Sequence, residues 1–85
     1  MAALSNLAPT VVIRAARGSD GPALRRLAAL DSAELPTGEL LVAESDDSLV
    51  AALSLKTGER VADPFRRTAD VVDLLAYRAR FLNAA

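Results

Sequence analysis

The residues best suited to chemistry stand just before the predicted last helix, where Arg66, Arg67 and Thr68 follow one another. The first N–H groups of a helix have no partner within it, so a helix start attracts anions. Phosphate sites there usually use glycine, yet the stretch 64–71 has none and places Asp70 where an anion would sit. The pattern predicts either a weak, degenerate phosphate site at these three residues or solubilising charge at an exposed turn, and the missing glycine favours the second interpretation.

Other candidate catalytic groups have no chemical partner in the sequence. Glu39, Glu44 or Glu59 could act as a general base and Tyr77 as a general acid. Histidine and cysteine are both absent, which removes the commonest general base, the activator that a serine nucleophile needs, and any thiolate metal ligand. We therefore interpret the glutamates as polar strand residues and Tyr77 as an amphipathic residue at a helix boundary or interface. The sequence predicts no catalytic residue and no metal site.

Composition limits the protein to few functional classes. The chain has 85 residues and a formal net charge of −1, which indicates one small domain without the positive charge of a nucleic-acid binder. The basic pairs at 25–26 and 66–67 lie near aspartates, which favours a solvated surface. Residues 1–9 carry no basic side chain and do not resemble a secretory signal, and no apolar run is long enough to span a bilayer. We expect a cytoplasmic protein with no nucleic-acid or membrane partner.

Hydrophobic patterning predicts a tail over residues 1–9 and a single domain over 10–85. The expected elements are a strand at 10–16, a helix at about 22–31 that Ser19 or Asp20 would cap, a hairpin of 39–45 and 49–55, a strand at 59–62 and a helix at 69–82. Asp46 and Asp47 tolerate the left-handed backbone of the hairpin turn. This order, β-α-β-β-β-α, predicts an α+β fold with a mostly antiparallel four-stranded sheet and two main helices.

The apolar residues predict how these elements pack. On the strand 49–55 both faces are apolar, so we expect cover on both sides, with one helix on each. Simple alternation puts Leu49, Ala51, Leu53 and Leu55 on one face and Val50, Ala52 and Ser54 on the other. The helical period puts Leu24, Leu27, Ala28 and Asp31 on one stripe of the first helix, and Val71, Val72, Leu75, Ala79 and Leu82 on the buried stripe of the last. Thr68 is the expected N-cap of that last helix.

Three segments together resemble the first half of a GNAT-type N-acetyltransferase. They are the strand Val12-Ile13-Arg14-Ala15-Ala16 leading through Asp20 into Ala23-Leu24-Arg25-Arg26-Leu27, the hairpin Leu41-Val42-Ala43-Glu44 with Leu49-Val50-Ala51-Ala52-Leu53-Ser54-Leu55, and Val61-Ala62-Asp63-Pro64-Phe65-Arg66-Arg67. The resemblance implies the family's half fold and makes the last helix the counterpart of its acetyl-CoA-binding helix. It also implies that Arg66 stands at the family's first basic position, with acetyl-CoA as the cofactor of an active member.

Where the family has spaced glycines after that basic position, this chain has Arg67, Ala69 and Val71. The family's remaining strand, helix and closing hairpin have no counterpart before Ala85. We therefore expect a small non-catalytic domain on a truncated acetyltransferase-like scaffold, without a cofactor, acting through self-association or protein binding. The expected surface is the edge strand from Glu59 to Ala62, which has no outer neighbour. The alternative is an acyl-CoA-dependent N-acetyltransferase whose site a second chain completes.

Overall fold

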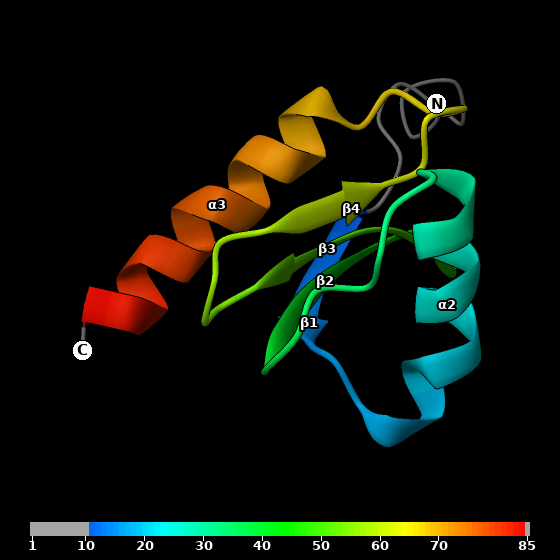
Figure 1. Cartoon of the computed structure of the whole chain (residues 1–85). Helices are drawn as coiled ribbons and strands as arrows, with labels where there is room; N and C mark the ends of the chain where they lie inside the picture. The colour runs from blue at the N-terminus through cyan, green and yellow to red at the C-terminus, as the bar shows by residue number, and fades with distance from the viewer. Residues whose placement is uncertain (1–10, 85) are drawn as a thin grey trace, which may run out of the picture.

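Four antiparallel strands form one sheet in chain order at the centre of the structure, a computed structural model that describes residues 11–84 (Figure 1). The elements are β1 (Val11–Ala15), the 3-10 turn η1 (Gly18–Asp20), α2 (Gly21–Leu30), β2 (Leu40–Ser45), β3 (Ser48–Ser54), β4 (Arg60–Ala62) and α3 (Ala69–Ala84). This α+β order confirms the predicted fold class. The predicted tail, residues 1–9, lies outside the described residues.

The hairpin of β2 and β3 turns at Asp46 and Asp47, as the sequence predicts. Their φ angles are 53° and 69°. These angles belong to the left-handed region, which aspartate tolerates better than most residues because its short side chain can bond locally. The turn therefore sets where the two longest strands begin to pair.

One register shift in this hairpin corrects the predicted strand faces. Ala43 pairs with Ala51, whereas Glu44 pairs with Leu49, so Val50 is an extra residue in β3. Such a bulge breaks the alternation of side chains along a strand. As a result Leu49 packs with the cluster under α2, while Val50 packs with the cluster under α3, so the prediction was wrong for both residues.

The two helices cover opposite faces of the sheet (Figure 1). The cluster on the α2 face contains Leu24, Leu27, Leu40, Val42, Leu49, Ala52 and Val61. The cluster on the α3 face contains Leu41, Ala43, Val50, Ala51, Leu53, Leu75 and Ala79. The expected cover on both faces is thus confirmed, and it explains why the central strands are apolar on both sides.

The helix α3 is longer than the strands beneath it. Leu75 and Ala79 are buried against β2 and β3, as the predicted stripe requires. Leu82 belongs to the same predicted stripe but is 51% exposed. The reason is visible in Figure 1, where the C-terminal turns of α3 extend past the end of the sheet. Among residues 11–84, neither helix is both long enough and apolar enough to cross a membrane.

Candidate functional site

The three predicted site residues line one open depression at the start of α3. Its volume is about 500 Å³, and its walls are formed by Pro64, Arg66, Arg67, Thr68, Ala69 and Asp70. The turn between β4 and α3 brings these side chains together. The carbonyl of Thr68 accepts the Val72 N–H at 2.8 Å, which places Thr68 at the predicted cap position.

The aspartate Asp63 organises the turn that carries these arginines. Its Oδ1 accepts the Phe65 N–H at 2.9 Å, and its backbone carbonyl accepts the Arg66 N–H at 3.3 Å. Its Oδ2 lies 3.6 Å from Nε of Arg66, whose side chain is 45% exposed. One of the two positive charges is thus partly engaged by a carboxylate that shapes the turn.

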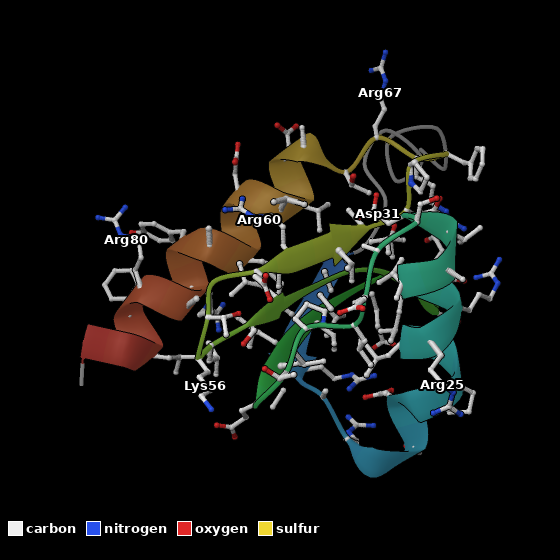
Figure 2. The ribbon with its side chains drawn as sticks, viewed as in Figure 1. Arg25, Asp31, Lys56, Arg60, Arg67 and Arg80 are labelled. Carbon is white, nitrogen blue, oxygen red and sulfur yellow. The ribbon has the colours of Figure 1, made fainter. Side chains whose placement is uncertain are left out.

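The second arginine, Arg67, extends away from the body of the protein (Figure 2). It forms no ion pair with any residue in the described range 11–84. Asp70 lines the same depression and adds a negative charge next to the helix start. The arrangement can attract an anion only weakly, because one cation is partly used, the other points to solvent and a carboxylate opposes it.

The candidate acids and bases lie in different parts of the fold. Glu39 and Glu59 are exposed at strand ends, and Glu44 is bonded to Arg14 at 2.9 Å. Tyr77 lies on α3 and is 57% exposed. The centroid of its ring is 4.9 Å from that of the Phe81 ring, and the two rings are arranged edge to face. The structure therefore assembles no acid–base pair from these four residues, and no buried side-chain N or O within the described part lacks a hydrogen-bond partner.

The structure contains an ion network, formed by Arg14, Asp20 and Glu44, that the sequence did not predict. Arg14 Nη1 and Nη2 lie 2.8 and 3.0 Å from the two carboxylate oxygens of Asp20, and its Nε lies 2.9 Å from Glu44. The strand register explains the second contact. Arg14 pairs with Val42, and Glu44 is two residues further along β2, on the same face. A single arginine within an apolar strand was the signal that could have revealed this network.

Asp20 occupies the N-cap position of α2, one of the two caps that the sequence predicts, but its side chain makes a different contact. Its carboxylate does not cap α2. Instead Oδ2 accepts the Arg17 N–H at 2.7 Å, which closes the 3-10 turn. The hydrogen bonds from Arg14 first, and then from Arg17, lower the pKa of Asp20 to about 2. The pKa of Arg14 is raised by its hydrogen bonds to Asp20 and Glu44. Arg14 and Asp20 therefore stay ionised at neutral pH, and the contacts of Arg14 join β1 to η1 and to β2.

The predicted open edge, β4, is partly covered. The Glu59 carbonyl and the Asp63 N–H bond back to β3, so the backbone of Arg60 and Ala62 faces outward. Asp31, at the C-terminal end of α2, accepts the outward Ala62 N–H at 3.1 Å. A carboxylate on the apolar stripe of the predicted helix was the sequence signal for this contact. The edge that remains is short.

A different exposed surface lies on α3. Leu74, Tyr77 and Phe81 are 49%, 57% and 60% exposed. Their spacing of three and four residues places them on one side of the helix, almost opposite the buried Leu75 and Ala79. We call these three residues the outer stripe. None of the three belongs to the buried stripe that the sequence predicts for this helix.

Comparison with known proteins adds no relative: no family model, no curated protein and no solved structure matches this chain.

Proposed function

We propose that this domain binds another polypeptide and carries out no chemistry of its own. The observation that supports this is the outer stripe, with three large apolar side chains side by side on the exposed face of α3. Each exposes about half of its surface or more, so together they present roughly 300 Å² of apolar area, estimated from the size of such side chains. Patches of this size on small proteins often serve as interaction sites.

The scaffold of this proposed binding module is the acetyltransferase-like half fold that the sequence resembles. The order of strands and helices supports the idea, and so does the place of the turn 63–68 directly before α3. The edge from Glu59 to Ala62 is proposed as a secondary contact surface. Its contribution is limited because Asp31 already occupies one of its outward N–H groups. We propose the cytoplasm as the location on composition alone.

The apparent mass of the chain in an extract of its own cells, chemically cross-linked before lysis so that weak complexes survive dilution, tests the association. Wild type should migrate above the mass of the free chain, 8.9 kDa, and the double variant Leu74→Ser/Phe81→Ser should migrate as the free chain. Phe65→Ser is the matched control, since Phe65 is an exposed ring outside the outer stripe. Free-chain mobility of the wild type, or an equal effect of the control, would show that the outer stripe is not an association surface.

The second candidate function is acyl-CoA-dependent N-acetyl transfer with a site that another chain completes. The observation in its favour is that Arg66, Arg67 and Thr68 line one depression at the start of α3. Calorimetric titration with acetyl-CoA tests it. Micromolar binding that Arg66→Ala abolishes and Arg25→Ala preserves would favour the enzyme, because Arg25 is an exposed arginine on α2, outside the depression. Absence of heat at millimolar acetyl-CoA is the result we expect.

A further inference from the structure

Two opposite charges flank the outer stripe on the same side. Asp73 precedes Leu74 and Arg80 precedes Phe81, so the charges are seven residues apart and occupy equivalent positions on the helix. Both side chains are exposed, and neither forms an ion pair with any residue within 11–84. Figure 2 shows Arg80 extending from α3 away from the sheet. One flank of the outer stripe therefore carries a negative charge at one end and a positive charge at the other, both without an ion-pair partner among the described residues.

Such a flank is complementary to itself only when the second copy runs in the opposite direction. A two-fold axis near Tyr77 would place Asp73 of each copy opposite Arg80 of the other, which gives two attractive contacts from one surface. The apolar residues would meet in the same arrangement, since Leu74 and Phe81 lie on either side of Tyr77 along the stripe.

A parallel arrangement is less favourable because of Asp70. This residue lies one turn before Leu74 on the same side of α3 and is exposed. Parallel helices would place Asp70 of each copy against Asp70 of the other, and like charges in direct contact are destabilising. The antiparallel arrangement moves the two Asp70 side chains to opposite ends of the contact. Figure 1 shows no described element on the side of α3 away from the sheet, so nothing among residues 11–84 blocks either approach.

We propose that the polypeptide bound by the outer stripe is a second copy of this chain, held antiparallel through α3 with Asp73 facing Arg80 across the two-fold axis. This inference rests on the proposed function and names its partner. The two stripes bury far less than the 1,200 Å² or so of a stable interface, so the dimer is weak and reversible. It forms where the concentration of the chain is high, and the flanking charges decide its direction.

Charge reversal in the purified full chain tests the inference, with sedimentation equilibrium as the measurement. Asp73→Arg and Arg80→Asp should each weaken the dimer by roughly five- to thirtyfold, because two attractive contacts become repulsive. An equimolar mixture of the two variants should restore wild-type affinity, since the copy with two positive charges then faces the copy with two negative charges. Each variant chain folds in the mixture as it does alone. An affinity that is regained only in the mixture must therefore come from contacts between the two chains.

The matched control is Arg78→Asp, which changes the charge by the same amount on the other flank of the outer stripe. It should leave the dimer within about twofold of wild type in the antiparallel arrangement, whereas a parallel dimer would lose Arg78 as the partner of Asp73. A mixture of Asp73→Arg and Arg80→Asp no tighter than either alone would overturn the inference, as would a purified wild type that stays monomeric. If the purified wild type is monomeric but the chain in the cell extract still migrates above 8.9 kDa in a way that depends on the outer stripe, the proposed function holds with a different partner. If neither experiment shows association, both the inference and the proposed function are wrong.

Discussion

The two helices that cover the sheet differ in the surfaces that they turn outward. On the α2 face the helix has one apolar stripe, and Leu24, Leu27 and Ala28 of that stripe are buried. On the α3 face the helix has a buried stripe and, nearly opposite, the exposed outer stripe. A helix that only needs to cover a sheet requires one apolar stripe. The second stripe on α3 is therefore not needed to cover the sheet.

Charged residues follow the same division. On the α2 side Arg14 reaches two carboxylates with donor–acceptor distances of 2.8 to 3.0 Å, and Asp31 accepts a hydrogen bond from the edge of the sheet. On the α3 side Arg66 lies 3.6 Å from its only carboxylate partner among the described residues, and Asp73 and Arg80 face solvent. Short, shielded ion pairs fix local geometry, whereas long, exposed ones leave their charges available to other molecules.

The largest expected effect separates two neighbouring leucines of α3. Leu75→Ala should lower the free energy of unfolding by about 3 kcal/mol, because Leu75 is fully buried between α3 and the sheet. Leu74→Ala should lower it by less than about 1 kcal/mol, since about half of Leu74 is already exposed. Urea unfolding at low protein concentration, where the chain is monomeric, measures both. Equal losses would mean that the outer stripe is part of the core after all.

A smaller effect is expected from the ion network. Asp20→Asn should lower the free energy of unfolding by about 2 kcal/mol at pH 7, because it removes the charge from hydrogen bonds to Arg14 and Arg17. Since the pKa of folded Asp20 is about 2, below the ordinary 3.8, the unfolded chain binds more protons between these values. The stabilisation is complete above about pH 4 and is lost as the pH falls towards 2.

Urea unfolding between pH 7 and pH 2 checks this prediction. The variant should be less stable than wild type at neutral pH, and the difference should shrink on acidification. Asp73→Asn is the control, because its carboxylate is exposed and has no ion-pair partner among the described residues. A difference between wild type and Asp20→Asn that stays constant down to pH 2 would contradict a charge-dependent role.

Local patterns predicted most of the fold, and contacts between distant segments account for what they missed. The hairpin turn followed from Asp46 and Asp47, since turn chemistry depends on adjacent residues. The bulge at Val50 did not follow, because a bulge exists only in relation to the partner strand. The contact between Arg14 and Glu44 joins residues 30 apart in sequence, and only the strand register brings them together.

The candidate site shows the same limit. Grouping Arg66, Arg67 and Thr68 was a local inference, and the structure does place the three around one depression. The direction of Arg67 and the engagement of Arg66 by Asp63 depend on how the turn folds, which the sequence did not reveal. The resemblance to acetyltransferases stays a prediction, since no comparison tests it.

The smallest expected effect concerns Arg66. Arg66→Ala should change the free energy of unfolding by less than about 0.5 kcal/mol, because its contact with Asp63 is long and the side chain is 45% exposed. Urea unfolding beside Asp20→Asn under identical conditions is the measurement. A loss as large as that of Asp20→Asn would show that the turn before α3 is held by its charges, like the α2 face. A negligible loss would show that the contact between Arg66 and Asp63 contributes little to folding, unlike the shorter contacts between Arg14 and its two carboxylates.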